Sequence, residues 1–153
     1  MASKLKKTQP IQTLGLDPSV LFEQAITMIS QQLRSLILPP TEQQLLADLN
    51  MFATSCVSLL AFYRSSFEHR QAYRMTTLPE NTASGAFMQI QRTTARELSE
   101  SVGRIHQSVM DLYRRHGVNQ AYQHGLYYLL QSIDHARAQS NLMVDELKSI
   151  KSR

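Results

Sequence analysis

The stretch "YQHGLYYLLQSIDHARAQSNLMVDELKSI", residues 122–150, carries the clearest helical pattern of the chain. Apolar or small residues recur there at alternating spacings of four and three: Tyr122, Leu126, Leu129, Ile133, Ala136, Ser140, Met143, Leu147 and Ile150. This alternation puts one face of an α-helix against its neighbours and favours left-handed supercoiled packing. The stretch therefore predicts a long helix with one buried seam.

Three segments upstream repeat the pattern, separated by Pro39-Pro40 and by "TTLPENTASG" at 76–85. Their seams are Phe22, Ile26, Ile29, Leu33 and Leu36; then Leu46, Leu49, Ala53, Cys56, Leu60, Tyr63 and Phe67; then Ala95, Leu98, Val102, Ile105, Val109, Leu112 and His116. Short connections make consecutive helices antiparallel. We therefore predict an all-α fold, a four-helix up-down bundle with long heptad-patterned helices. The same seams also suit a coiled-coil oligomer, and the sequence leaves both uses open.

Side chains at the expected helix ends support these boundaries. Asp17 is a good N-cap, and Pro18 suits the first helical position because its missing N–H would have no helical partner there. Thr41 and Gln44 have the spacing of a capping box, in which two side chains satisfy free amides at a helix start. The sequence thus predicts that one helix begins after Asp17 and that another begins directly after the proline pair.

The stretch "YRRHGVNQAYQHGLYY", residues 113–128, concentrates histidine, tyrosine and arginine at the predicted connection between the third and fourth helices. Arg114, Arg115 and His116 would complement the negative end of the third helix dipole. Gly117 suits a left-handed C-cap, and Asn119 suits the N-cap of the fourth helix. Most of this cluster is therefore interpreted as a turn with packed flanks.

The length and composition bound the organisation of the chain. The 153 residues suit one domain, which we predict at 17–153, preceded by a mobile basic N-terminal arm at 1–16. The arm has no apolar run typical of a secretion signal. The most apolar stretch, 52–63, is about half the length of a transmembrane helix, so no membrane span is expected. The single cysteine, Cys56, cannot form an intramolecular disulfide, and a cytoplasmic location is expected.

The residues that most catalytic and metal sites need are missing or scattered. A di-iron site in a helical bundle needs Glu-x-x-His pairs, and the chain has none. Adjacent pairs such as Glu68-His69 point about 100° apart on a helix. One cysteine, five scattered histidines and five widely separated glycines fit neither a zinc site nor a phosphate-binding loop. We therefore expect no enzymatic activity, no metal and no cofactor.

One candidate interface is the side of the fourth helix opposite its seam. Advancing about 100° per residue brings these residues together there: Gln120, His124, Tyr127, Gln131, His135 and Leu142. Tyr127 and Leu142 are large apolar groups, and uncharged neighbours lower the cost of desolvating them. Isolated exposed apolar residues are also ordinary, so an interface and a plain surface both remain open.

A second candidate is a basic pole at one end of the bundle. An up-down topology brings together the arm, the end of the second helix and the C-terminus, with Lys4, Lys6, Lys7, Arg64, Arg70, Arg74, Lys148, Lys151 and Arg153. Basic and aromatic residues interleaved at 62–74 suit phosphates and bases. Glu68, Asp145 and Glu146 dilute this charge, and the chain carries only +4 in total. Ordinary solvated helix ends explain the cluster as well.

The sequence predicts a non-enzymatic protein-protein interaction protein: an adaptor, chaperone or assembly subunit that self-associates. The alternative is a module that binds nucleic acid or an anionic surface through the basic pole. The first interpretation rests on the uncharged outer face of the fourth helix. The second rests on the cations of the basic pole, which could meet phosphates.

Overall fold

The structure, a computed structural model, describes residues 17–74 and 83–149. The helices are α2 (Pro18–Ser35), α3 (Gln43–Arg74), α4 (Ala83–His116) and α5 (Gln120–Ser149), with a short 3₁₀ turn, η1 (Pro40–Glu42), before α3. The predicted all-α fold is confirmed. The predicted N-terminal arm and Ile150 lie outside the described residues, as do Lys151 and Arg153.

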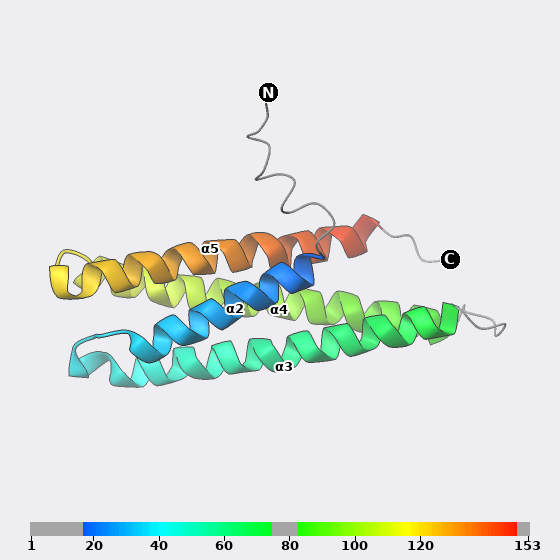
Figure 1. Ribbon diagram of the computed structural model, residues 1–153, viewed down its shortest axis with the longest axis horizontal. Helices are drawn as coiled ribbons and strands as arrows, with labels where there is room; N and C mark the ends of the chain where they lie inside the picture. The colour runs from blue at the N-terminus through cyan, green and yellow to red at the C-terminus, as the bar shows by residue number, and fades with distance from the viewer. Residues whose placement is uncertain (1–16, 75–82, 150–153) are drawn as a thin grey trace, which may run out of the picture.

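The helices form a closed up-down-up-down bundle (Figure 1). Consecutive helices run antiparallel and pack against each other, and α2 closes the ring by packing against α5. α2 makes more extensive contact with α5 than with α3. The four-helix bundle predicted from the seams is therefore the observed fold.

The predicted seams form the core. Buried seam residues are Phe22, Ile26, Ile29 and Leu33 in α2; Leu49, Ala53, Cys56, Leu60 and Tyr63 in α3; Ala95, Leu98, Val102, Ile105, Val109 and Leu112 in α4; and Leu126, Leu129, Ile133, Ala136, Ser140, Met143 and Leu147 in α5. Leu36, Leu46, His116 and Tyr122 are half-buried at the seam ends. The side chain of Phe67 is outside the described part of the chain. The heptad alternation thus correctly identified the inward face of each helix.

α2 is much shorter than its neighbours. Its 18 residues span about 27 Å, whereas the 30 to 34 residues of α3, α4 and α5 span about 45 to 51 Å. α2 therefore covers only part of the length of the other three helices, as Figure 1 shows. Its start is capped as predicted: the backbone N–H of Ser19 donates to Oδ1 of Asp17 at 3.0 Å, and Pro18 occupies the first turn.

The predicted capping box at the start of α3 is wrong. The 3₁₀ turn η1 intervenes, its N-cap is Pro39, and it has no side-chain cap hydrogen bond. The backbone N–H of Glu42 donates to the carbonyl oxygen of Pro39 at 2.9 Å. The amide of Gln44 instead donates to Asp48 at 3.1 Å. Pro39 and Pro40 restrict the backbone to a tight turn directly before α3, so this helix does not begin at a side-chain cap.

The connection between α4 and α5 follows the prediction only in part. Asn119 caps α5, since the backbone N–H of Ala121 donates to its Oδ1 at 2.9 Å. Gly117 does not adopt the predicted left-handed conformation. Its N–H continues the helical pattern by donating to the carbonyl oxygen of Tyr113 at 2.7 Å. A Cβ atom at Gly117 would collide with that same carbonyl, so the position requires glycine because of close backbone approach.

Candidate protein-interaction surfaces

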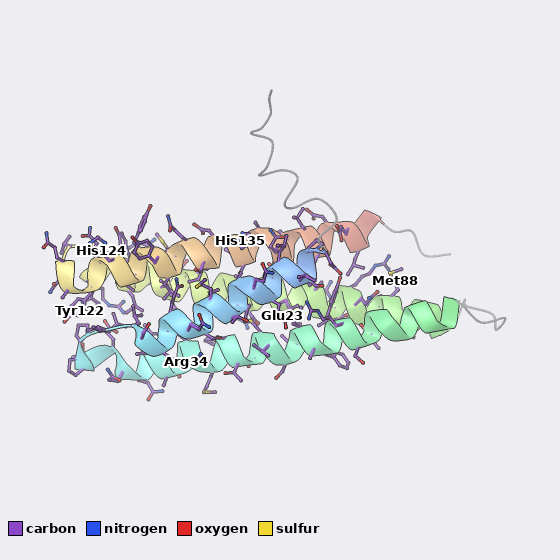
Figure 2. The ribbon with its side chains drawn as sticks, viewed as in Figure 1. Glu23, Arg34, Met88, Tyr122, His124 and His135 are labelled. Atoms are coloured by element: carbon purple, nitrogen blue, oxygen red, sulfur yellow. The ribbon has the colours of Figure 1, made fainter. Side chains whose placement is uncertain are left out.

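The structure places the predicted face of α5 on the outside of the bundle. Each of the six predicted residues is exposed: Gln120, His124, Tyr127, Gln131, His135 and Leu142. The two large apolar members stand out, with Tyr127 49% and Leu142 46% exposed. Figure 2 shows His124 and His135 along the same helix. The face predicted from the helical period is therefore one accessible surface of the bundle.

An aromatic neighbour, Tyr128, extends this surface toward α2. It is 54% exposed, and its ring stacks on His124 with 6.4 Å between centroids and meets Tyr127 edge-on at 5.8 Å. Tyr128 is not part of the face predicted from the sequence, because adjacent residues on a helix point about 100° apart. Tyr128 lies at the boundary between α5 and α2, where it lines a groove between the two helices.

The α2–α5 groove runs between these two helices in two connected parts that share Gln32 and Tyr128. One part, of about 390 Å³, is lined by Gln24, Ala25, Met28, Gln32, Tyr128, Gln131, Ser132 and His135. The other, of about 330 Å³, is lined by Gln32, Ser35, Leu36, Ile37, Ala121, Tyr122, Gly125 and Tyr128. Gln131 and His135 of the predicted face are therefore groove residues, whereas Tyr127 and Leu142 lie outside it.

The groove combines exposed apolar side chains with an unused hydrogen-bond acceptor. Met28 is 48% and Ile37 is 68% exposed. The side-chain oxygen of Gln32, where the two parts meet, is buried and has no hydrogen-bond partner within the described chain. Gly125 leaves room for the side chain of Leu36, the C-cap residue of α2, because a Cβ there would lie 2.9 Å from Cδ1 of Leu36. The lining thus mixes apolar side chains with uncharged polar ones, as in grooves that receive a helix.

α3 has an unusual amount of apolar surface outside the core. Met51 is 68%, Val57 52% and Phe62 54% exposed. By length and composition, the 27 residues Pro40–Ser66 are long and apolar enough to cross a membrane, and only 22% of their most apolar window is buried in the bundle. The expectation of no membrane span was based on the twelve residues 52–63 alone. The outer face of α3 was not predicted as a candidate interface, although the sequence carries no charged residue between Asp48 and Arg64.

The structure describes only part of the predicted basic pole. Figure 1 shows the C-terminal ends of α3 and α5 at the same end of the bundle, and Lys148 is exposed there. Arg64 has an intramolecular role: it donates to Glu23 at 2.8 Å and to the carbonyl oxygen of Ser19 at 3.2 Å. Arg70 and Arg74 belong to α3, but their side chains are not described. The predicted lysines of the arm and the C-terminal residues lie outside the described chain.

Glu42 joins the two connections at the other end of the bundle, which the sequence did not reveal. Nε and Nη2 of Arg115 donate to its two carboxylate oxygens at 3.0 and 3.1 Å. Nε2 of His116 lies 2.6 Å from Oε2 of the same carboxylate. These hydrogen bonds, first from Arg115 and then from His116, hold the pKa of Glu42 below its ordinary 4.5. Arg115 and His116 thus have a specific partner in addition to the helix dipole.

We predict that Glu42→Gln lowers the free energy of unfolding at pH 7 by about 1 kcal/mol, because a partly exposed charged pair contributes modestly. The folded-state pKa of Glu42 lies below the unfolded value, so its contribution is complete above the unfolded pKa and is lost as pH falls through the folded one. Urea unfolding at pH 7 and at pH 3 measures this, with the exposed Glu100→Gln as control. An equal loss at both pH values would contradict the assignment.

Cys56 is buried in the seam of α3, and burial raises the pKa of its thiol to about 11. At neutral pH it is therefore protonated and shielded, as expected for a packing residue. Within residues 17–74 and 83–149, no group of three His, Cys, Asp or Glu side chains is placed to hold a metal ion. The surfaces above are thus the features on which a functional argument can be built.

Comparisons of the chain with protein-family models, with curated proteins and with solved structures find no match. The class of protein is defined by the fold, a four-helix up-down bundle.

Proposed function

We propose that this chain is a non-enzymatic protein-protein interaction protein, an adaptor, chaperone or assembly subunit that also self-associates. The observation that carries the proposal is the exposure of Tyr127 and Leu142 on one face of α5, 49% and 46% respectively, beside the apolar α2–α5 groove. We propose that the protein acts in the cytoplasm, where a buried cysteine without a disulfide bond, such as Cys56, is ordinary.

The chemistry of the α5 face and of the groove favours a helical partner. The 15 positions from Tyr127 to Leu142 correspond to about 22 Å along the helix, which suits a helix lying alongside. Tyrosine buries a large area with few rotatable bonds and keeps a hydroxyl for hydrogen bonding. Gln131 and His135 between them carry less desolvation cost than lysine or glutamate.

Site-specific photo-crosslinking tests this proposal. A photo-reactive amino acid at position 127 is expected to capture a discrete protein from the native cell extract, and the same group at the exposed position 107 of α4 serves as control. Specific capture at 127 but not at 107 supports the α5 face as a contact surface. Equal capture at both positions, or none at either, would overturn the proposal.

A second function, binding of nucleic acid or an anionic surface through the basic pole, is favoured by one observation. α3 and α5 finish at the same end of the bundle (Figure 1), where α3 ends at Arg74 and Lys148 near the end of α5 is exposed. Arg64 does not strengthen it, because this guanidinium already contacts Glu23. The second function therefore rests on fewer cations than the sequence suggested.

We predict that Arg70→Gln with Arg74→Gln weakens DNA binding and reduces the slope of log affinity against log salt by about 2, because two fewer phosphates would be neutralised. Filter binding across a salt series measures this. Arg64→Gln is the matched control, expected to lower stability rather than the slope, since its ion pair is internal. If the wild-type chain does not bind DNA at low salt, the nucleic-acid function is excluded.

A further inference from the structure

The outer face of α3 is uncharged over about four turns. The sequence contains no charged residue between Asp48 and Arg64. Met51 is 68% and Phe62 54% exposed, and the 11-residue step between them is close to three helical turns, so both point to the same side. Apolar side chains gathered on one helix face are typical of a surface that another molecule covers.

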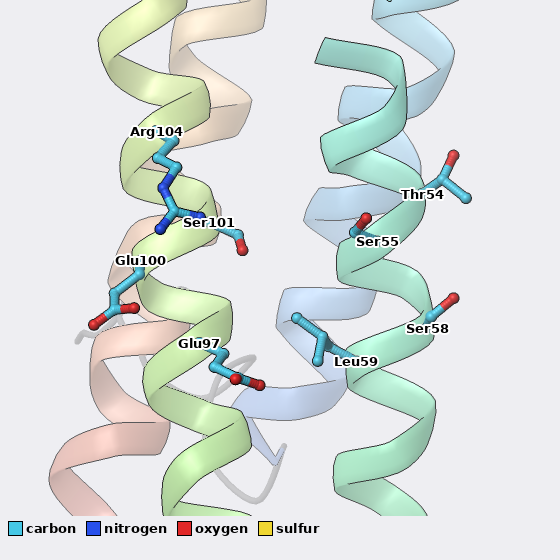
Figure 3. A pocket seen from close by; sticks show the side chains of 8 residues that line it. All are labelled: Thr54, Ser55, Ser58, Leu59, Glu97, Glu100, Ser101 and Arg104. Atoms are coloured by element: carbon cyan, nitrogen blue, oxygen red, sulfur yellow. The ribbon is translucent and has the colours of Figure 1, made fainter. Parts of the chain in front are cut away.

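Beside this face lies the α3–α4 groove, of about 540 Å³. It is lined by Thr54, Ser55, Ser58 and Leu59 of α3 and by Glu97, Glu100, Ser101 and Arg104 of α4. Figure 3 shows Leu59 and Glu97 directed into the gap between the two helices, with Glu100 turned to the other side of α4. Thr54, Ser55 and Ser58 have short side chains, so another helix can approach the backbone of α3 closely at this place.

The α3–α4 face also carries opposite charges at matched positions. Glu97 and Arg104 are exposed and are seven residues, or about two turns, apart on α4. Neither forms an ion pair within the described ranges 17–74 and 83–149. The face therefore offers one unpaired anion and one unpaired cation, aligned along the helix.

These features are arranged symmetrically about one level of the bundle. Along α3, the midpoint of the groove residues Thr54, Ser55, Ser58 and Leu59 is also the midpoint between Met51 and Phe62. Along α4, the midpoint of all the groove residues is also the midpoint between Glu97 and Arg104. A twofold axis at this level, perpendicular to the helices, would place Met51 against Phe62 of a second copy and Glu97 against Arg104 of that copy. The face is thus complementary to itself, as an isologous interface requires.

We propose that a second copy of this chain docks antiparallel on the α3–α4 face, with α3 over α3 and α4 over α4. The contact buries Met51 and Phe62 of both copies and forms two symmetry-related Glu97–Arg104 ion pairs. This inference deepens the self-association included in the proposed function by naming the partner and the face. It leaves the outer face of α5 and the α2–α5 groove free for other proteins.

A lipid bilayer fits the same apolar face less well. α4 packs along α3, and its exposed Glu97 and Arg104 would approach the hydrocarbon core together with Met51 and Phe62. Charged side chains in the bilayer interior are costly. Against a second copy, Glu97 and Arg104 instead find partners of opposite sign.

Charge reversal with rescue tests the dimer. Sedimentation velocity of the full chain over a range of concentrations should show a dimer, and Glu97→Arg or Arg104→Glu alone should weaken it by about tenfold or more. The combined variant Glu97→Arg with Arg104→Glu should restore the dimer, because the swapped charges meet again across the axis. Phe62→Glu, which changes an exposed residue, should also give monomers with an unchanged circular dichroism spectrum.

Three outcomes would overturn the proposed dimer. The first is a wild-type chain that stays monomeric at every concentration, and the second is a combined charge variant no better than the single ones. The third is a monomer that floats with vesicles of neutral and anionic lipid, which would assign the face to a membrane. Tyr127→Ala separates the two proposals: if it abolishes the dimer while Phe62→Glu does not, self-association uses α5 and only the α3–α4 inference fails.

Discussion

Replacing Tyr127 with alanine is expected to weaken partner binding by about tenfold or more while thermal melting changes little, because a central aromatic anchor contributes mainly to the contact. Leu142→Ala should act in the same direction on the same face. Both side chains are about half exposed in the isolated chain, so their truncation removes little core packing. Melting of the purified chain and quantitative capture of the crosslinked partner measure the two effects.

Tyr122→Ala is the matched control for this prediction. Tyr122 lies on the same helix, but its ring packs against the core and meets His116 edge-on at 5.8 Å. Its loss should lower the melting temperature and leave the binding of the remaining folded protein nearly unchanged. If Tyr127→Ala and Leu142→Ala behave like Tyr122→Ala, the outer face of α5 is structural and the proposed interface is wrong.

The second large effect is expected in the core. Ile133 is fully buried in the seam of α5, and Ile133→Ala should reduce the free energy of unfolding by about 3 to 4 kcal/mol, because it loses transfer free energy and leaves a cavity. Urea unfolding at one fixed protein concentration is the measurement, since association would otherwise change the apparent stability. Ala138→Ser, at an exposed position of the same helix, should stay within about 0.5 kcal/mol of wild type. A loss below about 1 kcal/mol for Ile133→Ala would contradict the observed seam.

The seams were predictable because packing in a long-helix bundle imposes one local rule on many residues. Each inward position must be apolar or small every three or four residues, and this rule can be read without knowing the partner helix. Leu98, Ile105 and Leu112 illustrate it, since all three are completely buried. The outward face of α5 followed from the same period, which is why Tyr127 and Leu142 were placed correctly on the surface.

Features that depend on two distant segments were not predictable in the same way. Glu42 and Arg115 are 73 residues apart, and only the folded bundle brings their turns together. The α2–α5 groove is lined by residues of both helices, and the helical period does not predict that the side chain of Leu36 lies against Gly125. By contrast, the charge-free span of α3 was visible in the sequence, but its meaning depended on knowing that Met51 and Phe62 face outward.

Hydroxyl-radical footprinting, read out by mass spectrometry, tests whether the outer face of α5 contacts a protein. We expect Tyr127 and Leu142 to be oxidised readily in the purified chain and to be protected in complexes isolated from the native extract. Val118, 91% exposed in the α4–α5 connection, should be oxidised equally in both samples. Equal oxidation of Tyr127 and Leu142 in the free chain and in the complexes would contradict the claim.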